Sequence, residues 1–193
     1  MTDGKPAAHV GDWQLSDDEM IAETRVFTLR RHRAASPADP GKSGEFVYLD
    51  APDWVNVVAL TPEREVVLIE QYRHGIHEVT LEVPGGTVDD GEDPLRAGLR
   101  ELREETGYEG TGGRLIGLVT PNPAMMNNRC HTVLVREVAR RHEPAFDGLE
   151  EIHTRLAPFE EVPDMIRNGA ITHALVVAAF HHLLLYEAER GEP

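Results

Sequence analysis

The feature that most constrains the fold is the segment of residues 84–108, where a glycine pair precedes a short, glutamate-rich stretch of helical character. Asp93 followed by Pro94 is a strong helix start, because the aspartate side chain caps free amide groups and proline fits the first helical position. Gly107 is a typical helix stop. The sequence therefore predicts a helix over residues 94–106.

Three carboxylates gather on one face of this predicted helix. At about 100° per residue, Glu101, Glu104 and Glu105 fall within an arc of about 100°. The like charges at i and i+4 oppose the helix by about 0.2–0.5 kcal/mol, and the last-turn carboxylates also lie at the negative end of its dipole. One interpretation is a solvated face on which Arg100 and Arg103 offset these charges. The other is a site for Mg²⁺ or Mn²⁺, which select carboxylate and carbonyl oxygens and would turn repulsion into coordination.

The spacing of the segment favours the second interpretation. Its fixed positions are Gly86, Glu92, Arg100, Glu101, Leu102, Glu104, Glu105, Gly107 and Tyr108. This pattern resembles the Nudix hydrolase signature, and Tyr108, where the family has a bulky aliphatic residue, is the only soft match. So many fixed positions are far more specific than a lone glycine fingerprint. The resemblance implies a Nudix α/β/α sandwich with a mixed β-sheet, preceded by an antiparallel β extension.

The resemblance also implies roles for residues of the segment. Mg²⁺, or Mn²⁺ in its place, would be held mainly by Glu101 and Glu105, with a carbonyl of Gly85 or Gly86. Glu104 would be a further ligand or would support the ligands from behind. Arg100 would hold the carboxylates by ion pairing, and Glu92 would brace the loop against the helix. Bound cations would neutralise the charge that develops during phosphoryl transfer and make water easier to deprotonate.

The wider chain resembles the ADP-ribose pyrophosphatase branch, whose members hydrolyse the pyrophosphate of nucleoside diphosphate sugars to a nucleoside monophosphate and a sugar phosphate. Arg73, in "EQYRHG", matches a strand arginine that touches the diphosphate, and Pro123 matches a marker proline. The branch commonly has a glutamate before the arginine of the following loop, whereas this chain has Asn127, Asn128 and Arg129. This departure places GDP-mannose beside ADP-ribose among the expected substrates, with Asn128 and Arg129 as candidate substrate contacts.

A further glutamate of this branch, on a loop, orients or deprotonates the attacking water. The stretch "FDGLEEIH" offers Glu150 and Glu151 for this catalytic role. Alignment on Ile152 favours Glu150, and both remain open. Ordinary solvated loop acids are the alternative interpretation.

Charge and composition exclude several classes of protein. The chain has 19 basic and 34 acidic residues, a net charge of −15, which repels nucleic acid and anionic membranes. No apolar run approaches bilayer length, and the single cysteine, Cys130, allows no internal disulfide, so a cytoplasmic protein is expected. Two alternatives remain for the function: a non-catalytic Nudix-fold sensor of nucleotide sugars, or a Nudix enzyme acting on dinucleoside polyphosphates or coenzyme A.

Two regions are expected along the chain. Residues 1–53 form a β-rich extension, too polar and too short to fold alone, that pairs two subunits into a homodimer in the resembling branch. Residues 54–193 form the Nudix domain. The apolar runs "WVNVVAL" and "VVLIEQY" predict a buried hairpin around "TPERE", and further helices are expected near residues 159–169 and 174–189.

Overall fold

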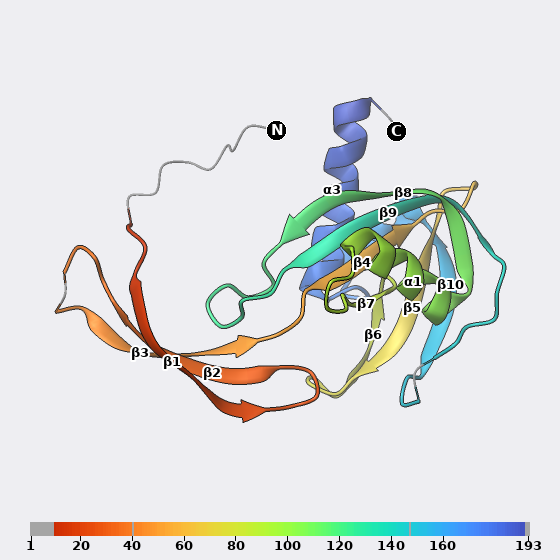
Figure 1. Cartoon of the computed structure of the whole chain (residues 1–193). Coiled ribbons are helices and arrows are strands. Elements are labelled where there is room, and N and C mark those ends of the chain that lie inside the picture. The colour runs from red at the N-terminus through yellow and green to blue at the C-terminus, as the bar shows by residue number, and fades with distance from the viewer. Residues whose placement is uncertain (1–9, 40, 147, 192–193) are drawn as a thin grey trace. The chain divides into compact units, whose positions relative to one another are not determined.

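The computed structural model describes residues 10–39, 41–146 and 148–191, and the chain divides into two compact units (Figure 1). The first unit comprises residues 1–51 and 122–127, and the second comprises residues 52–121 and 128–193. Each unit has its own β-sheet structure.

The first unit is a three-stranded antiparallel sheet in the order β1-β2-β3. Its strands are β1 (Gln14–Glu23), β2 (Thr28–Ala35) and β3 (Ser43–Asp50). The antiparallel β extension expected from the sequence is present, and β2 pairs with β3 without a shift from Thr28 opposite Asp50 to Ala35 opposite Ser43. The strand β1 was not predicted, and all of its residues are exposed.

The second unit contains two sheets. A four-stranded mixed sheet, in the order β7-β4-β9-β8, consists of β4 (Trp54–Ala59), β7 (Gly85–Thr87), β8 (Tyr108–Val119) and β9 (Cys130–Arg140). Only β4 and β9 run parallel in it. A three-stranded antiparallel sheet, in the order β10-β5-β6, consists of β5 (Glu65–Arg73), β6 (Glu78–Glu82) and β10 (Ile152–Pro158).

The prediction of a hairpin within one sheet was wrong for β4 and β5. The turn between them forms as expected, with the Thr61 amide donating to the Glu65 carbonyl and a bridge between Leu60 and Val66. Beyond this bridge the two strands diverge, and each joins a different sheet. Each strand has a run of successive buried residues, Val57 to Ala59 in β4 and Val66 to Ile69 in β5, so these runs carry no sign of which partners the strands take.

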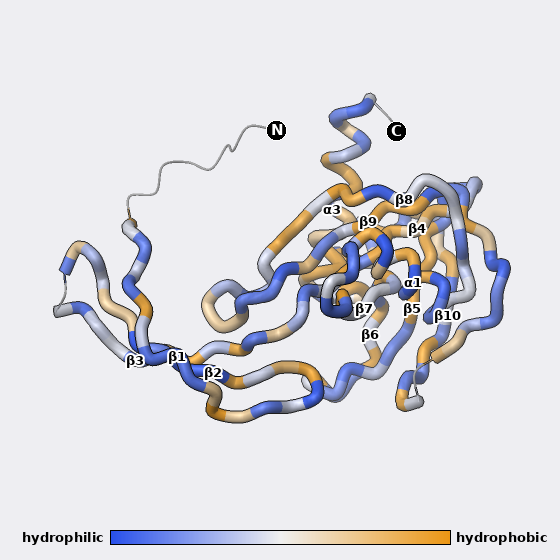
Figure 2. The backbone as a smooth tube through the Cα atoms, in the orientation of Figure 1, coloured by the Kyte–Doolittle hydropathy of each residue, from blue (hydrophilic) through white to orange (hydrophobic). Residues whose placement is uncertain are grey.

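Helices pack on both sides of the mixed sheet. The helix α1 (Pro94–Thr106) shares one core cluster with Val57, and α3 (Ala174–Arg190) shares the other with Val58, the next residue of β4. Successive residues of a strand face opposite sides, so the two helices cover opposite faces of the sheet. This is the α/β/α arrangement expected from the sequence, and apolar residues line its central strands (Figure 2).

The remaining helices are short. A 3₁₀ turn (Phe159–Glu161) leads into α2 (Val162–Arg167), and Pro163 lies in the first turn of α2. The predicted bounds of α1 and α3 agree with the structure within one residue. Among the described residues, no helix is both long and apolar enough to cross a bilayer.

Candidate functional site

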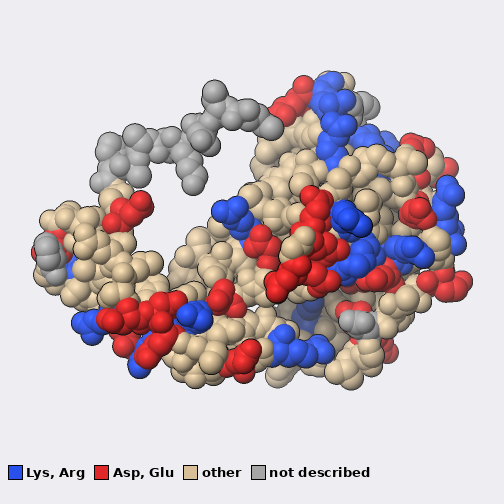
Figure 3. All heavy atoms as spheres, in the orientation of Figure 1, with Lys and Arg blue, Asp and Glu red and all other residues tan. Residues whose placement is uncertain are grey.

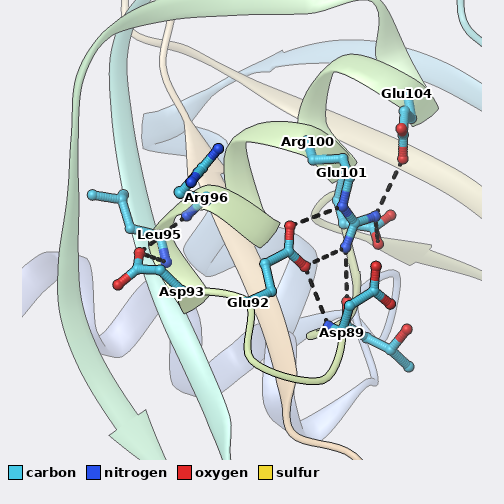
Figure 4. Close-up of polar contacts among 9 residues, drawn as sticks. Asp89, Glu92, Asp93, Leu95, Arg96, Arg100, Glu101 and Glu104 are labelled. Atoms are coloured by element: carbon cyan, nitrogen blue, oxygen red, sulfur yellow. Dashed lines mark hydrogen bonds and ion pairs between the residues drawn. The ribbon is translucent and has the colours of Figure 1, made fainter.

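Capping at both ends fixes the position of α1. One side-chain oxygen of Asp93 accepts hydrogen bonds from the Leu95 amide at 3.0 Å and the Arg96 amide at 3.3 Å (Figure 4). At the other end Gly107 adopts a left-handed conformation, φ 73°, and its amide donates to the Arg103 carbonyl. The cap and the stop together determine which face of the helix carries the glutamates.

The glycine pair lies directly against this acidic face. The strand β7 pairs with β4, with Gly85 opposite Asn56 and Gly86 opposite Val55. A Cβ atom at Gly86 would lie 2.5 Å from the Glu101 carboxylate, and one at Gly85 would lie 2.2 Å from the Val55 carbonyl oxygen. Only glycine permits this approach of backbone to carboxylate.

Glu105 is the most buried of the three glutamates. Its side chain accepts a hydrogen bond of 2.8 Å from the Gly85 amide, and only 3% of its surface is exposed. Burial raises the pKa of the Glu105 carboxyl to about 8, the Gly85 amide opposes this, and the charges of Glu101 and Glu150 add to it. Such a carboxyl is ionised at neutral pH only when a positive charge is supplied nearby.

Arg100 gathers the other carboxylates of the segment (Figure 4). Its Nε and Nη2 donate to both oxygens of Glu92, at 3.1 and 2.9 Å, and Nη2 also donates to the Thr87 carbonyl. Its Nη1 donates to Glu101 at 2.7 Å and to Glu104 at 3.2 Å. Figure 3 shows the resulting patch of mixed charge over α1. Arg100 thus ties the loop before the helix to the acidic face, and the Glu92 carboxylate holds the pKa of Arg100 above its usual value.

The donors around α1 fit a hard divalent cation. Glu101 and Glu105 present carboxylate oxygens beside the backbone of Gly85 and Gly86, and the buried Glu105 makes no ion pair with any described residue. Within the described part of the chain, no three acidic, histidine or cysteine side chains already converge on one point. Arg100 instead draws Glu101 and Glu104 towards itself, so the Glu101 carboxylate would turn from Arg100 to an ion.

The loop after β9 is attached to the C-terminal end of α1. The Ala145 amide donates to the Glu104 carbonyl at 2.7 Å, and the His142 amide donates to the Gly107 carbonyl at 3.1 Å. Further along this loop Glu150 is exposed, and its negative charge acts on Glu101 and Glu105. The loop therefore brings Glu150 into electrostatic reach of the acidic face, whereas Glu151 is an exposed residue directly before β10.

Arg73 is engaged by a residue that sequence reasoning missed. Its Nε and Nη2 donate to the two carboxylate oxygens of Glu82, both at 2.7 Å, and Glu82 is 3% exposed. Burial alone would raise the pKa of Glu82, but hydrogen bonds from Arg73 and Thr80 outweigh it and hold the pKa below its usual value. The signal in the sequence was an acidic residue at the end of an alternating strand, separated from "PGG" by a single valine.

The other predicted substrate contacts are in two different units. Pro123 lies in an exposed turn of the first unit. In the second unit, Asn128 is buried, and its side-chain amide donates to the Pro52 carbonyl. The backbone amide of Arg129 donates to the Asp53 carboxylate, and Arg129 is exposed. The roles of Pro123, Asn128 and Arg129 in substrate binding stay predictions.

Comparison with known proteins decides the family. The NUDIX domain matches residues 52–180, which is the greater part of the chain and includes the whole acidic segment. The chain belongs to the Nudix family. Nudix hydrolases use divalent metal ions, in agreement with the hard-oxygen donors on α1.

Individual relatives place the chain within the Nudix family. It is 31% identical to a methanol dehydrogenase activator from Bacillus methanolicus, over 88% of this chain and 91% of that protein. It is 28% identical to an ADP-sugar pyrophosphatase from Mus musculus, over 94% and 84%. The crystal structure of an ADP compounds hydrolase superposes with a TM-score of 0.83 at 18% identity, covering 97% of this chain and all of that one, and shows the same fold. The protein is thus a Nudix hydrolase, and ADP-sugar and ADP-ribose pyrophosphatases are among its relatives.

Proposed function

We propose that this Nudix hydrolase uses Mg²⁺, with Mn²⁺ as a substitute, to cleave the pyrophosphate bond of nucleoside diphosphate sugars. The products are a nucleoside monophosphate and a sugar phosphate. The observation that carries the proposal is the buried carboxylate of Glu105 beside Glu101 and the glycine pair, a site that needs a cation. Names of relatives that act on ADP-sugars support the substrate class.

Each residue of the site then has a defined task. Glu101 and Glu105, with Glu104 and a carbonyl of Gly85 or Gly86, would hold the ion. When bound, the ion would neutralise charge on the diphosphate and make water easier to deprotonate.

Other residues act on the substrate and on the attacking water. Arg73 binds the diphosphate, because a guanidinium fork matches phosphate oxygens. Glu150 accepts the proton of the attacking water, whose oxygen bonds to phosphorus as the bridging P–O bond breaks. Arg100 keeps Glu101 and Glu104 in position until the ion arrives.

The direct test is a substrate panel with identification of the products. The protein is incubated with ADP-ribose, GDP-mannose and other nucleoside diphosphate sugars, with Mg²⁺ or with EDTA. We expect Mg²⁺-dependent formation of a nucleoside monophosphate and a sugar phosphate. Tight binding of a nucleotide sugar without turnover would favour the sensor, and turnover confined to dinucleoside polyphosphates or coenzyme A would favour the other alternative.

Two adjacent residues allow a matched test of the catalytic loop acid. Glu150→Gln should lower kcat by about two orders of magnitude with little change in KM, because it removes a general base and no binding contact. Glu151→Gln is the control and should retain turnover. The reverse result would assign the role to Glu151, and two fully active variants would remove a loop acid from the mechanism.

We also propose that the protein is a homodimer formed through the first unit. Large apolar side chains are exposed on its strands, at Leu15, Met20, Ile21, Phe46 and Val47, and at Trp13 directly before β1. Exposed apolar residues of this number are typical of an association surface. Size-exclusion chromatography with light scattering should give a dimer mass, and Ile21→Glu should shift it to the monomer. A monomer mass for the wild type would contradict the proposal.

A further inference from the structure

Arg73 and Glu82 lie outside the signature segment and form a bidentate ion pair. The carboxylate accepts two parallel hydrogen bonds of 2.7 Å from the guanidinium, an arrangement that fixes the orientation of both groups. The Glu82 side chain is 3% exposed, whereas the Arg73 side chain is 41% exposed. Glu82 is thus a buried partner that holds Arg73 in place, and Arg73 reaches the surface.

Glu82 is not the residue of β6 that lies directly opposite Arg73. The register of β5 and β6 places Glu78 directly opposite Arg73, and Glu78 is an exposed acid that could pair with it. Arg73 instead reaches along the sheet, past Thr80, to Glu82. The Thr80 hydroxyl donates to the same carboxylate at 2.5 Å, so Glu82 is itself held in place. The guanidinium is therefore directed towards the end of β6, which leads into Gly85.

This pairing leaves part of the guanidinium available. Two of its five N–H groups, on Nε and Nη2, are bound to Glu82, and within the described residues no acceptor lies within hydrogen-bonding distance of the others. The charges of Glu105 and Glu150 both act on Arg73. If Arg73 were not held, these carboxylates would attract it, and it would compete with a cation for them.

We propose that Glu82 is a positioning residue that presents the unbound N–H groups of Arg73 to an anionic substrate and keeps Arg73 from pairing with Glu105 and Glu150. The identity of the anion, a diphosphate, rests on the proposed function. The second part of the proposal, that Glu82 keeps Arg73 away from Glu105 and Glu150, does not depend on the identity of the anion. Glu82 thereby affects both anion binding by Arg73 and cation binding by the carboxylates.

The proposal is tested on four proteins: the wild type, Glu82→Gln, Arg73→Gln and the double variant. Binding of Mn²⁺ is measured without substrate, from the electron paramagnetic resonance signal of the free ion. Glu82→Gln should weaken Mn²⁺ binding about tenfold, because the released Arg73 then occupies the carboxylates. Arg73→Gln should not weaken it, and the double variant should bind as tightly as the wild type. Wild-type affinity in Glu82→Gln, or weak binding that persists in the double variant, would overturn the proposal.

Kinetics on a nucleoside diphosphate sugar at saturating Mg²⁺ provide the second readout. Glu82→Gln and Arg73→Gln should each raise KM about tenfold and change kcat less, and the double variant should be no worse than Arg73→Gln alone. A Glu82→Gln enzyme with a KM within about twofold of the wild type would contradict the presentation of Arg73. If the wild type hydrolyses no such substrate, the proposed function fails, and the Mn²⁺ measurement still tests Glu82.

Matched variants separate positioning from loss of folding. Glu70→Gln removes another arginine partner from β5, the exposed pair with Arg155 at 3.3 Å, and should leave both readouts unchanged. Thr80→Val keeps the shape of the side chain but removes the hydroxyl that holds Glu82. It should shift Mn²⁺ affinity and KM in the same directions as Glu82→Gln, by about threefold. An unaffected Thr80→Val, with Glu82→Gln unfolded, would refute the proposal.

Discussion

Replacing Glu105 by glutamine should make the metal-free protein more stable at alkaline pH. Burial raises the pKa of this carboxyl from 4.5 to about 8 in the folded protein. A raised folded-state pKa contributes stability that is complete below about pH 4.5 and is lost as the pH rises through about 8. The free energy of unfolding of the wild type should therefore fall by about 1.4 kcal/mol per pH unit across this window, on the order of 5 kcal/mol in total.

Glutamine has the size of a protonated glutamate and does not titrate, so Glu105→Gln lacks this loss. The assay is denaturant unfolding in EDTA, followed by circular dichroism, at about pH 5.5, 7 and 8.5. The difference in unfolding free energy between variant and wild type should grow with pH in favour of the variant. Saturating Mg²⁺ should stabilise the wild type at about pH 8.5 more than it stabilises Glu105→Gln. Parallel pH profiles for the two proteins in EDTA would refute the reasoning.

Three further predictions concern the residues around this carboxyl and the lone thiol. Gly86→Ala places a methyl group 2.5 Å from the Glu101 carboxylate, so Mn²⁺ affinity should fall about tenfold, and unchanged affinity in a titration would argue against that contact. Arg100→Ala leaves Glu92 and Glu101 without their cation and should lower the unfolding free energy by roughly 1–3 kcal/mol in denaturant titrations; no loss would show that the cluster is solvated. Burial raises the pKa of Cys130 to about 12, so Ellman's reagent should label it only after unfolding, and rapid labelling of the folded protein would contradict its burial.

The sequence was sufficient to predict the acidic segment of residues 84–108, because local rules determine its structure. Asp93 and Gly107 mark the ends of α1 by capping chemistry, and the structure has both caps where they were predicted. The spacing of Glu101 and Glu105 then fixes their common face. A glycine pair allows the backbone to approach closely, and the contacts of Gly86 with Glu101 show such an approach.

The pairing of strands that are distant in the sequence could not be predicted from such local rules. The strand β1 is exposed throughout and lacks the apolar alternation by which strands are found. In the part of the chain that the structure describes, it pairs with β2 alone, at one edge. The strands β4 and β5 have continuous apolar runs, so nothing in them shows that the chain leaves one sheet for another.

The role of Glu82 was hidden for a related reason. In an alternating strand such as β6 an acidic residue is expected to face water, and strand pairing would match Arg73 with Glu78. The structure buries Glu82 because a bidentate partner compensates its charge. That compensation depends on the reach of an arginine along the sheet, which no local pattern encodes.

The most direct test of the central claim is to locate the cations. A crystal grown with Mn²⁺ and a non-hydrolysable nucleoside diphosphate sugar, measured at a wavelength where manganese scatters anomalously, would show each ion as a peak. We expect peaks between the carboxylates of Glu101 and Glu105 and the diphosphate, with the Gly85 or Gly86 carbonyl beside them. Peaks only at other positions, with the nucleotide bound away from α1, would contradict the account.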